Sequence, residues 1–268
     1  MEQAKRDDKA KGLVRAGSQI AGAAVGGALG FLAGGPIAAA GAALAGSLFT
    51  EVLAEVASRQ LSTREEIRIG AAAAVALSQV KDRLELGHQP RTDGVASSSS
   101  SVPADAESLL EGVLLRAKAE HEEKKVRLVG NLFANVMFSP DVSFAEANHF
   151  LRIAETMTYR QFCIVSILHR RGLIPTIHLH ENEFSDPNFT LPISLLSLLQ
   201  EIYQLADLGL ISRQSDEIRG NQQIARHRYI VPVSMSLSDL GSRFALLFDV
   251  PSIPPEDISP ILSQLRLE

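Results

Sequence analysis

The apolar and polar positions divide the chain into a long uncharged stretch and a periodic remainder. No charged residue occurs from Ala16 to Thr50, and Gly34-Gly35-Pro36 interrupts this stretch midway. Proline cannot continue a helix from the preceding turn, and glycine permits a sharp bend. We therefore expect a helical hairpin with arms at 16–33 and 37–57, each about as long as a bilayer is thick.

Small residues recur at four-residue intervals along the first arm of this hairpin. On a helix such residues share one face, so that a second backbone can approach closely. The positions are Ser18, Gly22, Gly26, Gly30 and Gly34. The pattern resembles the glycine-zipper segments of membrane-inserting and channel-forming proteins. That resemblance implies a homo-oligomer that contacts the lipid bilayer through these residues, with Gly34, Gly35 and Pro36 as the hinge.

Insertion of the first arm by itself is energetically marginal. Each interior glycine costs a helix about 1 kcal/mol relative to alanine. The strongly apolar side chains together favour insertion by about 2 to 3 kcal/mol; they are Ile20, Val25, Leu29, Phe31 and Leu32. We therefore expect conditional insertion, or insertion as an oligomer. Basic residues flank both ends of the hairpin, which favours a cytoplasmic or inner-membrane-associated protein with both termini in the cytoplasm.

Residues 58–157 have the periodicity of a helical bundle. Thr63 and Glu66 have the spacing of a capping box, and the helix that they open ends near Gly87. Residues 88–104 are polar and include five consecutive serines. This composition predicts an exposed, flexible linker inside the bundle.

After the linker, apolar residues at three- and four-residue intervals predict one long helix over 105–138. Charged residues of both signs lie between Glu120 and Lys125. Their spacing is typical of a solvated helix face, so we expect this segment to be exposed. Ser143 and Glu146 form a second capping box that opens the next helix.

The last part of the chain, residues 158–268, mixes helical and strand-like patterns. After a first helix, the pattern predicts a helix at 191–207, a strand at 208–212, a strand at 229–237 and a helix at 238–248. The phrases LADLGLIS and VSMSLSDLGSRF resemble the end of many bacterial winged-helix domains. That resemblance implies a winged-helix-like α+β unit.

Charge argues against a general nucleic-acid-binding protein. The chain has 26 Lys and Arg against 31 Asp and Glu, a formal net charge of −5, and the expected recognition helix contains no Lys or Arg. The candidate nucleic-acid contacts are in the wing: Arg213, Arg219, Arg226 and Arg228. Asp216 and Glu217 dilute their charge. A protein partner at the winged-helix region therefore fits better than nucleic acid.

Catalytic and cofactor motifs are missing from the sequence. It has no phosphate loop, nucleophile elbow or HExxH motif, and its single cysteine, Cys163, excludes an intrachain disulfide. This cysteine lies in an apolar helix, where a buried thiol is expected. His178, His180 and Glu181 are the most metal-like cluster, although they lie between elements, where a polar loop is the ordinary explanation. We expect no enzymatic activity, no cofactor and no bound metal.

Together, the patterns predict a mainly α protein with a charged tail at 1–15, a hairpin at 16–57, a bundle at 58–157 and a winged-helix-like domain at 158–268. The leading hypothesis is a membrane-active protein whose hairpin anchors to or permeabilises a bilayer under control of the rest. The alternative is a soluble oligomeric regulator or adaptor that buries the Gly/Ala segment at its interface. Residues 120–171 are loosely similar to uncharacterised bacterial helical proteins associated with phage defence, which implies a toxic or anti-phage role.

Overall fold

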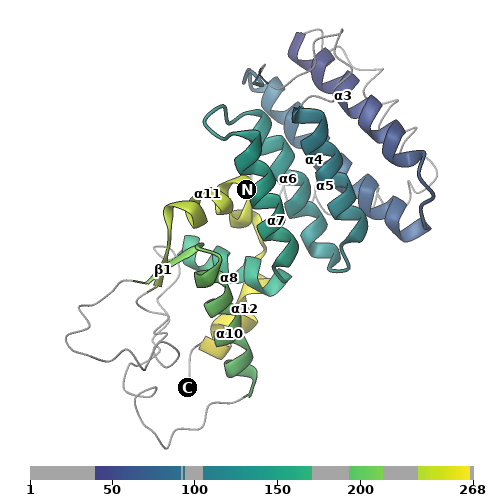
Figure 1. Cartoon of the computed structure of the whole chain (residues 1–268). Coiled ribbons are helices and arrows are strands. Elements are labelled where there is room, and N and C mark those ends of the chain that lie inside the picture. The colour runs from purple at the N-terminus through teal and green to yellow at the C-terminus, as the bar shows by residue number, and fades with distance from the viewer. Residues whose placement is uncertain (1–39, 92, 94–104, 171–192, 214–234, 266–268) are drawn as a thin grey trace, which may run out of the picture. The chain divides into compact units, whose positions relative to one another are not determined.

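The computed structural model of the chain describes residues 40–91, 93, 105–170, 193–213 and 235–265. These residues are mainly helical, with one small two-stranded sheet (Figure 1), so the predicted mainly α class is confirmed for them. The chain divides into an N-terminal unit, Met1–Thr156, and a C-terminal unit, Met157–Glu268. Each unit is described separately below.

The N-terminal unit is a bundle of helices built around α5. Helix α5 packs against each of the other described helices of the unit, and α6 packs extensively against α4. One face of α5 is fully buried, including Leu109, Leu110, Val113 and Leu114. The helices are α3 (Ala40–Ala57), α4 (Thr63–Glu85), α5 (Asp105–Ala119), α6 (Glu123–Met137) and α7 (Phe144–Thr156).

Helices α4 and α6 approach each other closely through small residues. A Cβ atom added to Gly130 of α6 would lie 2.7 Å from the carbonyl oxygen of Ala72 in α4, which is closer than atoms can pack. Ala72, Ala73 and Ala76 are buried at this contact. The small residues therefore let the two backbones approach closely and bury the apolar side chains on either side of the contact.

The prediction of one long helix over 105–138 is wrong. Helix α5 ends at Ala119 and α6 begins at Glu123, and the two helices pack against each other. The chain turns within the segment that was expected to be a solvated helix face. The reason is tertiary: α6 buries its apolar side against α4 and α5, which a continuous helix would not allow.

Two helix starts in this unit depend on local capping. Glu146 donates its backbone N–H to Ser143 Oγ at 3.1 Å, which confirms the predicted cap of α7. At α4 the capping residues are Ser62 and Glu65, where the Ser62 N–H donates to Glu65 Oε2 at 2.7 Å. The predicted box at Thr63–Glu66 is therefore wrong by one residue, because an adjacent Ser/Thr and an adjacent Glu offer the same spacing.

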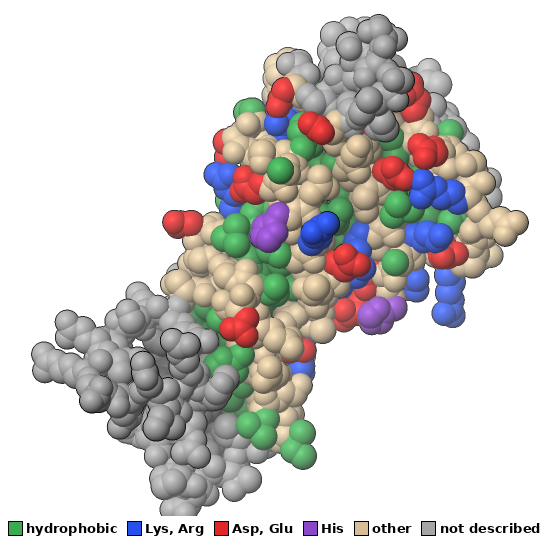
Figure 2. Space-filling view, viewed as in Figure 1, with side chains coloured by type: hydrophobic (Ala, Val, Ile, Leu, Met, Phe, Trp, Pro, Cys, Tyr) green, Lys and Arg blue, Asp and Glu red, His purple; other side chains and the backbone are tan. Residues whose placement is uncertain are grey.

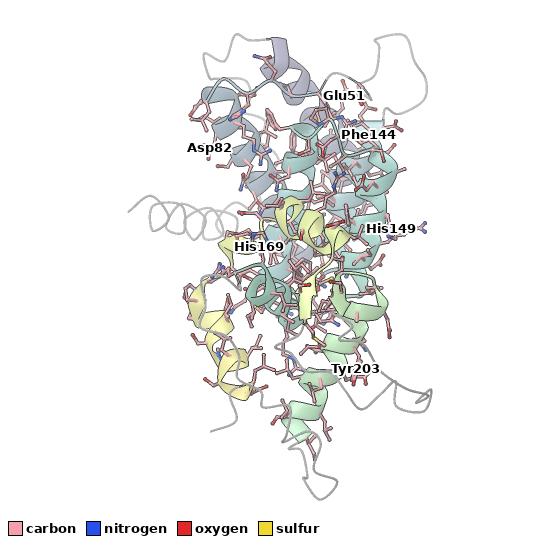
Figure 3. The ribbon with its side chains drawn as sticks, turned by 90° about the vertical axis from the view of Figure 1, so that its left-hand side faces the viewer. Glu51, Asp82, Phe144, His149, His169 and Tyr203 are labelled. Atoms are coloured by element: carbon pink, nitrogen blue, oxygen red, sulfur yellow. The ribbon has the colours of Figure 1, made fainter. Side chains whose placement is uncertain are left out.

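The start of the predicted linker belongs to the bundle. Arg91 is buried; its backbone N–H donates to the Met137 carbonyl at 2.8 Å, and its guanidinium donates to the Val142 carbonyl at 2.5 Å. The guanidinium also lies 4.2 Å from the ring centroid of Phe144, which Figure 3 labels at the start of α7. The prediction of an exposed segment over 88–104 is thus wrong at Arg91.

The C-terminal unit combines helices with a short antiparallel sheet. Ile211 of β1 pairs with Leu237 of β2. The core is aromatic: the ring of Phe162 lies 5.4 Å from Phe244 and 5.6 Å from Phe248 between centroids. The elements are α8 (Tyr159–His169), α10 (Ile193–Asp207), β1 (Ile211–Arg213), β2 (Met235–Leu237), α11 (Asp239–Leu247), a 3₁₀ turn (Val250–Ser252) and α12 (Pro255–Leu265).

The predicted helices at 191–207 and 238–248 are confirmed as α10 and α11, while α12 was not predicted. The described strands are shorter than expected, and residues 229–234 lie outside the described part of the chain. Gly241 of α11 is required by packing, because a Cβ there would lie 1.9 Å from the Leu210 carbonyl oxygen. Cys163 is buried as expected.

Candidate functional site

Most of the functional residues that the sequence predicts lie outside the described residues. This holds for the zipper face (Ser18, Gly22, Gly26, Gly30 and Gly34), the hinge (Gly34, Gly35 and Pro36), the metal-like cluster (His178, His180 and Glu181) and three wing arginines (Arg219, Arg226 and Arg228). The fourth, Arg213, is the last residue of β1, opposite Met235. The described structure therefore shows only the base of the predicted hairpin.

That base is α3, which contains most of the predicted second arm. Its buried side chains recur at intervals of one, three and four residues, which places them on one face. They are Leu48, Phe49, Val52, Leu53 and Val56. Glu51 and Glu55 are exposed. This part of α3 is an amphipathic helix docked on the bundle.

Two contacts fix α3 to the helices beneath it. Near its middle, the ring of Phe49 meets the ring of Phe133 from α6 edge to face, with centroids 5.3 Å apart. Just after its end, Arg59 forms ion pairs with Glu55, at 3.2 Å, and with Glu111 of α5. The aromatic contact and the ion pairs hold the helix at two separate points.

Docking limits how much of the second arm is available to a membrane. The side chains described as docked are Leu48, Phe49, Val52, Leu53 and Val56, and the part of the predicted arm that precedes them is residues 37–47. As a helix these would extend about 16 Å, roughly half of a bilayer's hydrocarbon core. Among the described residues, no helix is both long enough and apolar enough to span a membrane. A full second crossing therefore requires the docked residues.

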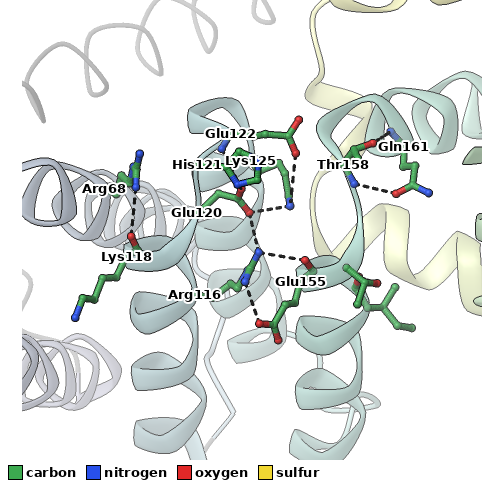
Figure 4. A network of polar contacts seen from close by, with 12 residues as sticks. Arg68, Arg116, Lys118, Glu120, His121, Glu122, Lys125, Glu155, Thr158 and Gln161 are labelled. Carbon is green, nitrogen blue, oxygen red and sulfur yellow. Dashed lines mark hydrogen bonds and ion pairs between the residues drawn. The ribbon is translucent and has the colours of Figure 1, made fainter. Parts of the chain in front are cut away.

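A buried cluster of charges occupies the turn between α5 and α6 (Figure 4). The side chain of Glu120 is fully buried and that of Lys125 is 2% exposed, with Lys125 Nζ 2.7 Å from Glu120 Oε2. Arg116 lies 3.1 Å from the same carboxylate and 3.0 Å from Glu155 of α7. The expectation that Glu120–Lys125 forms an exposed face is therefore wrong at its two ends.

The environment of Glu120 keeps this carboxylate ionised. Burial by itself would raise its pKa, but hydrogen bonds from Lys125 and from the Glu122 backbone N–H lower it, as do the charges of Lys125 and Arg116. The net result is a lowered pKa. A carboxylate whose pKa is lowered stays ionised at neutral pH, so the cluster has the chemistry of a structural ion pair.

The same turn brings together a trio with the ligand types of a metal site. Side-chain ligand atoms of Glu120, His121 and Glu122 lie within 4.8 Å of one another. However, Glu120 Oε1 accepts from the Glu122 N–H at 3.0 Å, and Oε2 faces Lys125 and Arg116. Both oxygens are engaged and two cations adjoin them, so we assign no metal here.

In the C-terminal unit, the cation beside α10 is neutralised. Arg160 of α8 donates to both carboxylate oxygens of Glu201, at 2.7 and 2.9 Å, and to Ser197 Oγ at 2.7 Å. This bidentate pair links α8 to α10. The guanidinium therefore binds side chains of α10 and does not add a phosphate-binding charge to the surface of that helix.

The surface of the N-terminal unit carries mixed charge. On the face shown in Figure 2, acidic and basic side chains are intermixed without a large patch of one sign.

Comparison with known proteins adds no assignment, because no family model, curated protein or solved structure matches the chain. The function must be argued from the residues of this chain.

Proposed function

We propose that this is a membrane-active protein whose glycine-zipper hairpin oligomerises and inserts into a bilayer, under control of the helical units. The observation that carries the proposal is the construction of α3. Its residues from Ala40 to Thr50 belong to the uncharged segment, and its apolar side chains between Leu48 and Val56 are docked on the bundle. One continuous helix thus joins the proposed membrane segment to the N-terminal unit.

The composition of the hairpin supports the same proposal. A run without charge from Ala16 to Thr50 is costly to expose to water, and its interior glycines weaken a helix that has no packing partner. Close packing along Ser18, Gly22 and Gly26 with a second helix would offset that cost. The proposed location is the cytoplasm or the inner membrane, with both termini cytoplasmic.

The proposed controlling region is the bundle together with a winged-helix-like C-terminal unit. The order of α10, antiparallel β1 and β2, and α11 supports this fold proposal. Arg160 is paired with Glu201, so its charge is not available to a phosphate group. We therefore propose that this unit binds a protein partner rather than nucleic acid. We propose no enzymatic activity for the protein.

The second candidate function is a soluble oligomeric adaptor that buries the Gly/Ala segment at its interface. One observation favours it: the apolar face of α3 is covered by protein, with Phe49 fully buried. The two candidates differ in what the residues before Leu48 contact, which is lipid in the first and a second protein surface in the other.

The test is leakage of dye-loaded anionic liposomes by the full-length protein. We expect the wild type to release dye and Gly26→Leu/Gly30→Leu to lose this activity, because leucine blocks close packing on the zipper face. The matched control is Ala24→Leu/Ala28→Leu, which adds the same side chains to the opposite face of the same arm and should retain release.

The outcomes separate the candidates. Full release by the zipper variant would contradict the role of the glycine face. A wild type that stays in the supernatant without release would favour the soluble adaptor. Co-sedimentation with liposomes without release would assign the hairpin as an anchor.

A further inference from the structure

We propose that the docking of α3 on α4, α5 and α6 is an autoinhibitory contact, and that insertion of the second arm requires release of α3 from the bundle. This inference rests on the proposed function. It concerns only the docked residues of α3 and the bundle residues that touch them.

The argument begins with one apolar face that has two uses. Leu48, Phe49, Val52, Leu53 and Val56 fill the bundle in the described structure. The same side chains would form the lipid-facing side of the second arm, because they share one buried face while Glu51 and Glu55 are exposed. A released α3 has the pattern of a helix that lies at the headgroup boundary, with its apolar face in lipid and its carboxylates in water.

The two uses exclude each other. The second arm has four strongly apolar residues before its first charge, namely Ile37, Leu44, Leu48 and Phe49. Docking buries Leu48 and Phe49 against protein, and the remaining residues are too short to cross a bilayer. Because insertion is already marginal, withdrawing half of these residues blocks it.

The bundle side of the contact provides a way to change docking without changing the membrane segment. Glu111 of α5 pairs with Arg59, and the side chain of Glu111 is 33% exposed. Its substitution is therefore compatible with folding. Phe133 is a less suitable position for such a substitution, because it is buried in the core of the bundle. Its loss would destabilise the fold.

The first experiment locks α3 in place. In a Cys163→Ser background, Arg59→Cys and Glu111→Cys are joined by a cleavable bismaleimide, using the side-chain contact that exists there. The control joins Glu55→Cys to Arg59→Cys, a pair within one helical turn that spans no contact with the bundle. Circular dichroism before and after linking checks that both proteins remain folded.

We expect the 59–111 link to reduce the rate of dye release by about tenfold or more, because the released population sets the rate. Cleavage of the linker should restore release, and the 55–59 link should leave it unchanged. Equal release by the locked and cleaved proteins would overturn the autoinhibitory contact while leaving the proposed function intact.

The second experiment weakens the docking of α3. Glu111→Lys places two cations against each other at the end of α3 and should increase release several-fold over wild type. Glu256→Lys, at an exposed position of α12, changes the net charge equally and should not. Equal release by both would overturn the inference. Absence of release and of liposome binding by every protein in the set, cleaved and Glu111→Lys included, would overturn both proposals.

Discussion

The two units place the same kind of ion pair in opposite environments. In the N-terminal unit, Glu120 and Lys125 are 0% and 2% exposed. In the C-terminal unit, Arg160 and Glu201 are 34% and 14% exposed and link α8 to α10 near the surface. Both pairs join segments that are separated by a turn or a loop. Only the first had to be removed from water for the fold to form.

This difference shows which unit depends on its polar contacts. Transfer of two charges into a core costs more than their attraction returns unless their hydrogen bonds are complete. Glu120 meets that condition through Lys125, Arg116 and the Glu122 backbone. The C-terminal unit keeps its partly exposed ion pair outside its apolar core, in which Phe244 and Phe248 stack with centroids 4.3 Å apart. Its ion pair adds to a core that is already apolar.

The largest effect should come from breaking the buried pair on one side. Lys125→Ala leaves the Glu120 carboxylate buried without its closest cation, and we expect the N-terminal unit to lose about 3 to 5 kcal/mol of unfolding free energy. Denaturation followed by amide hydrogen exchange in α5 and α6 would measure it. The control is Lys125→Met/Glu120→Leu, which removes both charges and should recover much of the loss. A loss of unfolding free energy in Lys125→Ala smaller than that expected for a surface ion pair would contradict the burial of Glu120 and Lys125.

An intermediate effect should appear on acidification. The pKa of Glu120 is lowered in the folded state, so its ionisation stabilises the fold above the unfolded-state pKa of about 4.3. This contribution is lost as the pH falls through the folded-state pKa. We expect the unfolding free energy of the N-terminal unit to fall more steeply below about pH 4 in wild type than in Lys125→Met/Glu120→Leu. Identical profiles would contradict the assignment.

The smallest effect should come from the pair in the C-terminal unit. Arg160→Ala should cost about 0.2 to 1 kcal/mol, since the pair is partly solvated and screened by salt. Denaturation of the C-terminal unit at low and high salt would measure the cost, and the difference from wild type should shrink at high salt. A loss as large as that of Lys125→Ala would remove the distinction between the two units.

Sequence reasoning succeeds here where structure is set by neighbours in the chain. The cap of α8 can be predicted, because Thr158 and Gln161 contact each other within one turn: the Thr158 N–H donates to Gln161 Oε1 at 2.8 Å. The hydrophobic periods of α10 and α11 likewise depend on local spacing. Gly241 is visible in the sequence, but the Leu210 carbonyl that requires it is seen only in the folded chain.

The charged segment was misread because burial is a tertiary property. Glu120 and Lys125 are five residues apart, a spacing that would separate them around a continuous helix. That spacing was a signal that the helix turns between them, although mixed charges of this kind are usually exposed. Arg91 was missed for the same reason, since its partners at Met137 and Val142 lie far along the sequence.

The first arm of the hairpin, its zipper face and three of the four wing arginines remain predictions, because they lie outside the described residues. Only the base of the hairpin is described, and it changes the hypothesis in one respect. The sequence predicts a second arm over 37–57, and the structure docks the apolar side chains of its last part on the bundle. This finding is the basis for the proposal that protein and lipid compete for one face of α3.

The packing of α4 has a consequence for how the protein can be divided. Helix α4 precedes residues 94–104 and its partners α5 and α6 follow them, yet α4 packs against both, with Ala72 against Gly130. Arg91, which also precedes residues 94–104, adds a further attachment, because its guanidinium donates to the Val142 carbonyl that follows them. Two polypeptides split within 94–104 should therefore reassociate without a peptide bond between them. The hairpin with α3 and α4 would then be an exchangeable cassette, which can be synthesised, labelled or replaced apart from the domains that receive it.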